Sequence, residues 1–185
     1  MSSASPSRIP AWVGENRKAD SGYRRKTVTP AKRSVTYSDP ARREKEMENN
    51  KTLEDVRKIF EGDRFATENG AVIEEIGHHS ATCSLVITDS HRNAMGAVMG
   101  GTYFMLADFA FAVAANWEKM GYVSLHSDIS FLGAAKGKKL IAKAICVKDG
   151  RTTACYRVDV TDEYGNLTAA VTATGYHVDT DKKYP

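Results

Sequence analysis

Residues 100–117, GGTYFMLADFAFAVAANW, constrain the fold more than any other part of the sequence. The segment is rich in Ala, Leu, Met and Phe, and it contains one carboxylate, Asp108, and no basic residue. Its 18 residues suffice for about five turns of α-helix. A helix that is apolar on all sides needs cover over most of its surface, so the sequence predicts a helix enclosed by other elements.

A membrane-spanning helix is the alternative, and the sequence disfavours it. The segment is at the short limit for spanning a bilayer, carries Gly100 and Gly101 at one end, and has Asp108 at its midpoint. A central carboxylate costs about 2.5–3.5 kcal/mol on insertion scales. We therefore expect a helix in a protein core and no association with a membrane.

Strand signals surround this helix. Ala81, Cys83, Leu85 and Ile87 alternate with other residues, which is the two-residue period of a half-buried strand. Short connections and turn residues such as Asp149-Gly150 favour antiparallel pairing. The predicted strands are at about 71–77, 80–88, 122–131, 138–148, 152–161 and 167–178. The expected fold class is α+β, in which a curved antiparallel β-sheet wraps one long central helix.

The ordered domain is expected to span residues 51–180. Thr52 with Asp55 three residues later is a helix-start signal, and the helix should run to about Phe60. Residues 1–50 are rich in Ser, Pro, Arg and Lys without a sustained apolar period, so we predict a disordered basic extension. They hold 11 Lys and Arg against 6 Asp and Glu, whereas the rest of the chain holds 15 against 17. The domain itself is thus not basic, which argues against nucleic-acid binding.

Cys83, Cys146 and Cys155 lie far apart, with no C-x-x-C pair and no Cys/His spacing typical of metal ligands. This pattern predicts neither a zinc site nor a disulfide framework. Free thiols fit a reducing cytosol, and no apolar signal segment is present at the N-terminus. We expect a cytoplasmic protein.

Asp108 is the candidate catalytic residue. A buried carboxylate is costly unless it is paired, hydrogen-bonded or functional, and burial suits such a group to general-base chemistry. The alternative is a structural role, in which Asp108 pairs with a partner such as His126 or Arg151 or caps a neighbouring loop, and the residue type alone does not decide between a structural and a catalytic role.

Gly100 and Gly101 open the helix, where backbone N–H groups lack intrahelical partners and the helix dipole is positive. Such an end can stabilise a developing oxyanion. Gly100 and Asp108 are about 12 Å apart along one helix, too far to act on the same carbonyl group. A site that uses both must draw them from two chains, which implies a symmetric dimer.

The run Asn93-x-x-Gly96-x-x-Met99-Gly100-Gly101, followed by Leu106-Ala107-Asp108, resembles the signature of hotdog-fold thioesterases of the phenylacetic-acid-degradation type. The similarity covers residues 53–178, including the turn at 148–151.

The resemblance implies an acyl-coenzyme A hydrolase that needs no metal or prosthetic group. It also implies a homodimer, often paired into a homotetramer, with active sites at the subunit interface. Asp108 would act as general base or nucleophile, Gly100 N–H would polarise the thioester carbonyl, and Asn93 would position water or the thioester.

The sequence departs from the family at Met99, where many members have His. Met99 cannot donate a hydrogen bond, so it would line an acyl pocket. Two alternatives therefore remain: a non-catalytic acyl-CoA-binding protein, and a hotdog enoyl-CoA hydratase or dehydratase. The hydratases usually pair the carboxylate with a His, which this helix lacks.

Further candidates concern substrate binding. Met99, Gly101 and Phe104 are candidates at the start of the helix, and Arg151 and Lys148 are candidates for the phosphates of coenzyme A. Each has a plainer interpretation as a core contact or a solvated charge. Ser124, His126 and Ser127 are interpreted as the polar face of a strand rather than as substrate contacts.

Overall fold

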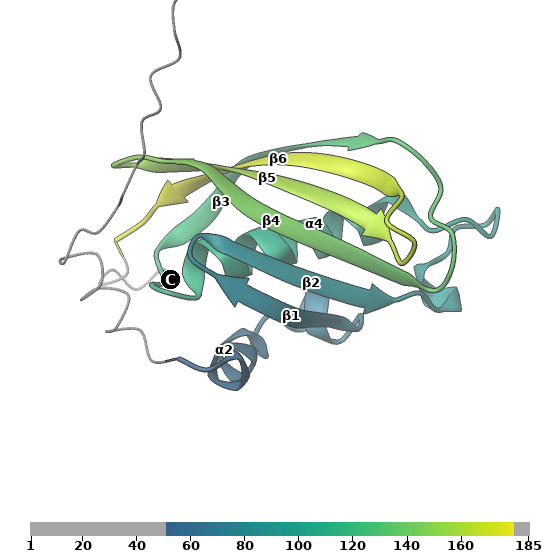
Figure 1. The fold of residues 1–185 in the computed structure, drawn as a ribbon, viewed down its shortest axis with the longest axis horizontal. Helices are drawn as coiled ribbons and strands as arrows, with labels where there is room; N and C mark the ends of the chain where they lie inside the picture. The colour runs from purple at the N-terminus through teal and green to yellow at the C-terminus, as the bar shows by residue number, and fades with distance from the viewer. Residues whose placement is uncertain (1–50, 180–185) are drawn as a thin grey trace, which may run out of the picture. The chain divides into compact units, whose positions relative to one another are not determined.

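A computed structural model describes residues 51–179; the predicted extension, residues 1–50, lies outside the described residues. One antiparallel sheet has the order β1-β2-β4-β5-β6-β3. One long helix, α4 (Gly100–Asn116), packs against it. The expected α+β architecture is confirmed (Figure 1). The strands are β1 (Ala71–Gly77), β2 (Ser80–Val86), β3 (Tyr122–Phe131), β4 (Lys139–Asp149), β5 (Thr153–Asp162) and β6 (Leu167–His177).

The chain crosses the sheet twice. Helix α4 leads from β2 to β3, which pairs only with β6 and forms the edge opposite β1. Residues 132–138 then return the chain to β4, which pairs with β2. β3 therefore stays at the edge of the sheet. One of its own edges is left unpaired within the described chain.

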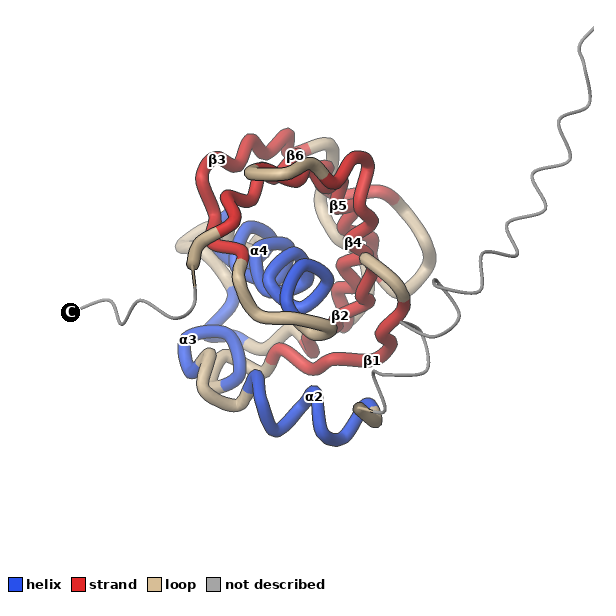
Figure 2. Tube along the Cα trace, turned by 90° about the vertical axis from the view of Figure 1, so that its left-hand side faces the viewer, coloured by secondary structure: helices blue, strands red, loops and turns tan. Residues whose placement is uncertain are grey.

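The sheet curves around α4 and supplies the cover that an apolar helix requires (Figure 2). Leu106, Ala107 and Ala110 are fully buried between helix and sheet. Phe111 meets Tyr156 of β5 edge to face, with ring centroids 5.2 Å apart. Burying each large apolar side chain contributes about 1.5–3 kcal/mol, so this helix–sheet interface stabilises the fold.

Helix α2 (Leu53–Phe60) begins as predicted. The Thr52 hydroxyl accepts from Asp55 N–H at 3.2 Å, and the Asp55 carboxylate accepts from Thr52 N–H at 2.9 Å, which completes a capping box. Phe60 meets Phe109 of α4 with ring centroids 6.2 Å apart. This contact fixes the segment that follows α2 beside the middle of α4.

The sequence-based prediction missed two short helices. α3 (Arg64–Thr67) and the 3₁₀ helix η1 (Asp89–His91) occupy segments for which the sequence predicted neither helix nor strand. Elements of three or four residues are too short to show an apolar period. In the described part of the chain, no helix is both long and apolar enough to cross a membrane.

A fully buried carboxylate anchors the β5–β6 turn to the returning crossover. Burial opposes ionisation of Asp162, but hydrogen bonds outweigh it: the side chain of Asn166 and the backbone N–H groups of Lys136, Asn166 and Tyr164 all donate to the carboxylate. Together they lower the pKa of Asp162 to about 2. Asp162 therefore remains charged inside the protein at neutral pH.

Candidate active site

Asp108 lies in the middle of α4, half-buried, between the buried side chains of Ala107 and Phe109. Ser124 Oγ donates a hydrogen bond to Asp108 Oδ1 at 3.1 Å. Ser124 is on β3 at an irregularity in the pairing with β6, between Ser124 and His126. Bulges of this kind redirect side chains, and here the serine points to the helix. Ser124 was interpreted from the sequence as part of a polar strand face.

The two ion pairs considered for Asp108 from the sequence are not formed in the described part of the chain. Among the described residues, neither His126 nor Arg151 forms an ion pair or hydrogen bond with Asp108. A single hydroxyl partner leaves oxygen lone pairs of the carboxylate available for a water molecule or a substrate.

A cavity of about 600 Å³ opens beside this carboxylate. Helix α4 forms one wall, and the segment containing α3 forms the other. Its size suits a small-molecule ligand. The lining residues are Asp63, Arg64, Phe65, Ala66, Gly101, Phe104, Met105, Asp108, Phe109 and Ala112.

Asp63 brings a second carboxylate to the cavity. It precedes the first residue of α3, but its side chain makes no capping hydrogen bond. Burial raises the pKa of Asp63, and the nearby charge of Asp108 raises it further. Asp63 could not be recognised as a site residue from the sequence, because an Asp after Gly62 is typical of a turn.

The start of α4 is arranged as the sequence predicts. Met99 precedes the helix without a side-chain cap. Within the described residues, the N–H groups of Gly100 and Gly101 donate no hydrogen bond. The ring of Phe131 lies over Gly100, and a Cβ there would come within 3.0 Å of Phe131 Cζ. Glycine thus permits close approach to this end of the helix.

Asn93 organises the loop before α4. Its Oδ1 accepts from the backbone N–H groups of Met95 and Ala97, at 3.0 and 3.1 Å. The loop also contains Gly96, whose φ of 79° lies in the left-handed region that favours glycine. Within one chain, the observed role of Asn93 is to hold this loop.

The structure brings together only part of the predicted site. Gly101, Phe104 and Asp108 line the cavity, whereas the described residues lining it do not include Asn93, Met99 or Gly100. Lys148 and Arg151 are exposed near the β4–β5 turn. Tyr122 contacts Asp149 there, so this turn lies where α4 ends rather than where it begins (Figure 1).

Comparison with known proteins identifies the family. The model of the Thioesterase superfamily matches residues 95–169. A putative esterase of Archaeoglobus fulgidus is 32% identical over 124 residues, which are 66% of this chain and 80% of that protein. The chain belongs to the thioesterase superfamily.

Two further similar proteins indicate which type of thioesterase this chain is. The acyl-coenzyme A thioesterase PaaI of Escherichia coli is 27% identical over 114 residues, 61% of this chain and 81% of that protein. The solved structure of a hypothetical thioesterase protein with coenzyme A, from Streptococcus pneumoniae, is 26% identical. It covers 64% of this chain and 96% of its own, with a TM-score of 0.60. The hotdog fold, the phenylacetic-acid-degradation type and thioester hydrolysis are confirmed.

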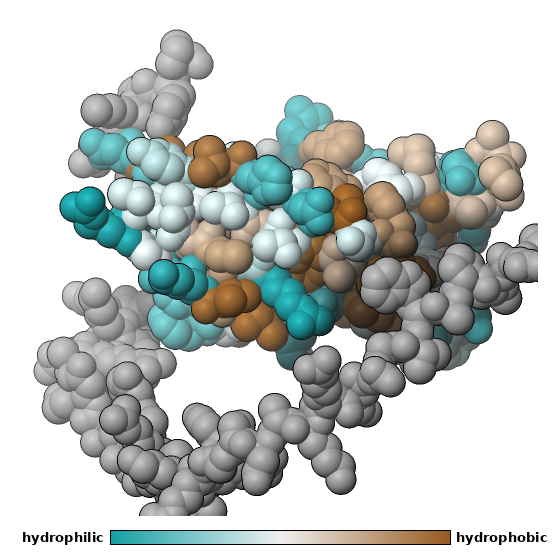
Figure 3. All heavy atoms as spheres, turned by 90° about the horizontal axis from the view of Figure 1, so that it is seen from above, coloured by the Kyte–Doolittle hydropathy of each residue, from teal (hydrophilic) through white to brown (hydrophobic). Residues whose placement is uncertain are grey.

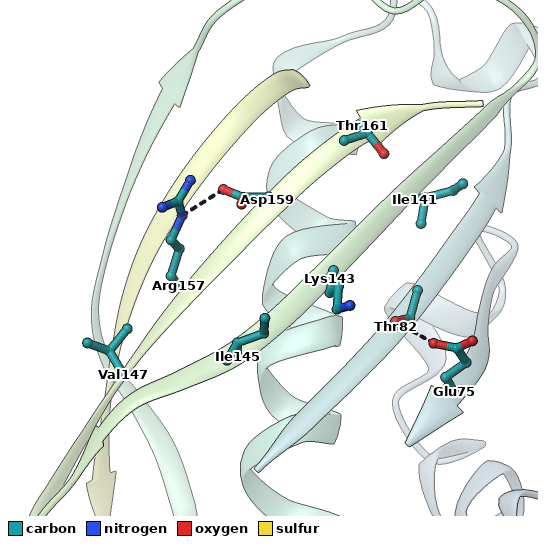
Figure 4. Close-up of a pocket in the computed structure, with 9 residues that line it drawn as sticks. All are labelled: Glu75, Thr82, Ile141, Lys143, Ile145, Val147, Arg157, Asp159 and Thr161. Carbon is teal, nitrogen blue, oxygen red and sulfur yellow. Dashed lines mark hydrogen bonds and ion pairs between the residues drawn. The ribbon is translucent and has the colours of Figure 1, made fainter. Parts of the chain in front are cut away.

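A second hollow, of about 580 Å³, lies on the outer face of the thioesterase sheet (Figure 4). Its polar side chains mostly bind one another: Arg157 pairs with Asp159 at 2.9 Å, and the Thr82 hydroxyl donates to Glu75 at 3.3 Å. None of the residues predicted for the site is among those that line it. The cavity beside Asp108 is therefore the candidate active site.

Proposed function

We propose that this thioesterase hydrolyses an acyl-coenzyme A thioester to the free acid and coenzyme A, with Asp108 as the catalytic carboxylate. The observation that carries the proposal is the placement of Asp108. It is half-buried in an otherwise apolar helix, has one hydroxyl partner, and opens into a cavity of about 600 Å³. The coenzyme A in the Streptococcus pneumoniae structure supports this substrate class.

In the proposed reaction, a water molecule attacks the thioester carbonyl carbon and Asp108 accepts its proton. The carbonyl π electrons move to oxygen, giving a tetrahedral oxyanion. When the oxyanion collapses, the C–S bond breaks and the electron pair leaves on sulfur. Coenzyme A departs as thiolate, which is a good leaving group, so a site without a histidine general acid is chemically sufficient.

The oxyanion needs a hydrogen-bond donor. The start of α4 cannot supply that donor to the cavity beside Asp108 of the same chain. Gly100 N–H is about 12 Å away along α4, and it does not line the cavity. We therefore assign the oxyanion-binding N–H to Gly100 of a second copy of the chain, with Asn93 beside it. In this arrangement Met99 and Phe104 contact the acyl group, and Lys148 and Arg151 serve the phosphates of coenzyme A.

The free edge of the sheet is a surface on which a second copy can pair. β3 has one unpaired edge, and Val123, Leu125 and Phe131 on it are exposed. Seen from above, apolar side chains gather toward one end of the molecular face in Figure 3. Pairing of two β3 edges would cover exposed apolar surface of this strand and satisfy its free backbone groups.

Thiol release from a panel of aliphatic and aromatic acyl-coenzyme A substrates tests the reaction. Asp108→Asn should lower kcat by about 10²-fold or more, the range for loss of a general base. Asp159→Asn makes the same chemical change on the outer face of the sheet and should retain wild-type rates.

The same panel separates the rival functions. Equal, slow release by wild-type protein and Asp108→Asn would indicate a binding protein instead of an enzyme. Hydration of an enoyl-coenzyme A without thiol release would indicate a hydratase. Either result overturns the proposal.

A mixing experiment tests the shared site separately. Asp108→Asn and Gly100→Val should each be inactive as homodimers. In a mixed dimer, one site receives an intact Asp108 from one chain and an intact Gly100 from the other, so about half of the activity should return. Absence of recovery in mixed dimers would place both groups in one chain.

A further inference from the structure

We propose that His78, His79 and Glu118 form a binding site for a divalent transition-metal ion of the zinc class. The site lies away from the cavity beside Asp108. His78 and His79 form the turn between β1 and β2, and Glu118 follows the end of α4. Figure 1 shows this turn beside the C-terminal end of α4. This inference is independent of the proposed reaction.

The donor atoms converge. One ligand atom from each of the three side chains lies within 4.8 Å of the other two. His78 Nδ1 is 2.9 Å from Glu118 Oε1, so the two atoms need to separate by only about 0.5 Å to ligate one tetrahedral Zn²⁺, whose bonds to nitrogen and oxygen are about 2.0–2.2 Å long. Two imidazoles and one carboxylate are a donor set that binds zinc with a fourth position left for water.

The surroundings of His79 resemble the outer shell of a metal site. Its Nε2 is 4.0 Å from Asp149 Oδ2, and its Nδ1 is 3.4 Å from the hydroxyl of Tyr156. With Nε2 as the metal ligand, the Tyr156 hydroxyl beside Nδ1 would orient the ring, as is usual for metal-bound histidine, whereas Asp149 at 4.0 Å is beyond hydrogen-bond distance. Among described residues, His79 is the only non-glycine with positive φ, at 49°. The two adjacent histidine rings lie edge to face, with centroids 4.1 Å apart.

The backbone around the site is already held. Trp117 Nε1 donates to Gly77 O at 2.9 Å, which joins the hairpin to the end of α4. Lys51 Nζ donates to the carbonyls of Trp117 and Glu118 at 2.8 and 3.2 Å. The Lys51 ammonium donates to backbone carbonyls, so the Glu118 carboxylate remains hydrogen-bonded to His78. The negative charges of Glu118 and Asp149 offset the positive charge that Lys51 brings near the proposed metal site.

Isothermal titration of the full, tag-free, chelator-treated chain with Zn²⁺ tests the site. We expect one ion per chain and an increased melting temperature, because a ligand that binds only the folded state stabilises it. His79→Ala and Glu118→Gln should each weaken binding by about 10-fold or more, given the effect of even outer-shell changes on metal affinity. Cobalt(II) bound in the same place should show visible absorption bands of a low-coordinate site.

His126→Gln is the matched control, since His126 is exposed on β3 and is not one of the three converging residues; it should bind Zn²⁺ like wild type. Melting temperatures of the metal-free variants check that each is folded. If wild-type protein takes up no Zn²⁺, or if His79→Ala binds it with unchanged affinity, His78 and Glu118 form an ordinary hydrogen bond and the proposal fails.

Discussion

Ser124 Oγ lies 3.1 Å from Asp108 Oδ1 and donates a hydrogen bond to it across the interface between β3 and α4. The two residues are 16 positions apart, and the bond aims one carboxylate oxygen while the other is left for water. Preorganised polar contacts of this kind reduce the reorganisation needed during a reaction. Ser124 is therefore a positioning residue in the proposed mechanism.

Ser124→Ala should lower kcat by about 10-fold and change KM much less, because a hydrogen bond to a charged group contributes about 1.5–3 kcal/mol. Ser127→Ala, on the same strand, is the control and should keep its rate. Steady-state kinetics with one acyl-coenzyme A measures both. Equal rates for the two variants would show that Ser124 does not position Asp108 for catalysis.

The pKa of Asp63 should fall when Asp108 becomes Asn. Burial and the charge of Asp108 together raise the Asp63 pKa, and the substitution removes only the charge. Burial keeps the Asp63 pKa above its ordinary value of 3.8. Carbon-13 titration of the side-chain carboxyls in both proteins measures the change. An unaltered Asp63 titration would mean that the two carboxylates do not interact.

Gly100→Ala should lower kcat more than Gly101→Ala. A Cβ at position 100 meets the ring of Phe131 at 3.0 Å, whereas at position 101 it meets the flexible end of Met99 at the same distance. The ring must move, which disturbs the helix start proposed to bind the oxyanion. Both variants should remain folded, since Ala is favoured over Gly in helices by up to about 1 kcal/mol. Kinetics and thermal melting compare the pair.

Asp162 should make the protein sensitive to acid. Its pKa is lowered from 3.8 to about 2, so its contribution to stability is complete above about pH 4 and is lost as the pH falls toward 2. Asp162→Asn should melt at a lower temperature at pH 7, because the amide offers poorer acceptors to the backbone N–H groups. The difference between the variant and wild type should shrink between pH 4 and pH 2. Denaturant titrations at several pH values test this, and a constant difference would contradict it.

The candidate site was predictable where it depends on one continuous segment. Asp108 stands out because it is the sole charge in an apolar helix, and Gly100 and Gly101 mark the start of that helix. Asp63 and Ser124 were not recognisable in this way. Each is an ordinary polar residue in a turn or on a strand, and only the packing of α3 and β3 beside α4 brings it to the carboxylate.

The sequence by itself determined the helix, the alternating strands, the capping box at Thr52 and the single acid in the apolar helix, because each depends on residues close together in the chain. The tertiary structure decided the strand order, the position of β3 at the sheet edge, the second carboxylate in the cavity and the meeting of His78 with Glu118. These depend on contacts between segments up to 65 positions apart, such as Ser80 and Ile145 in the pairing of β2 with β4. Local periodicity does not record them, since they arise only when the sheet closes around the helix.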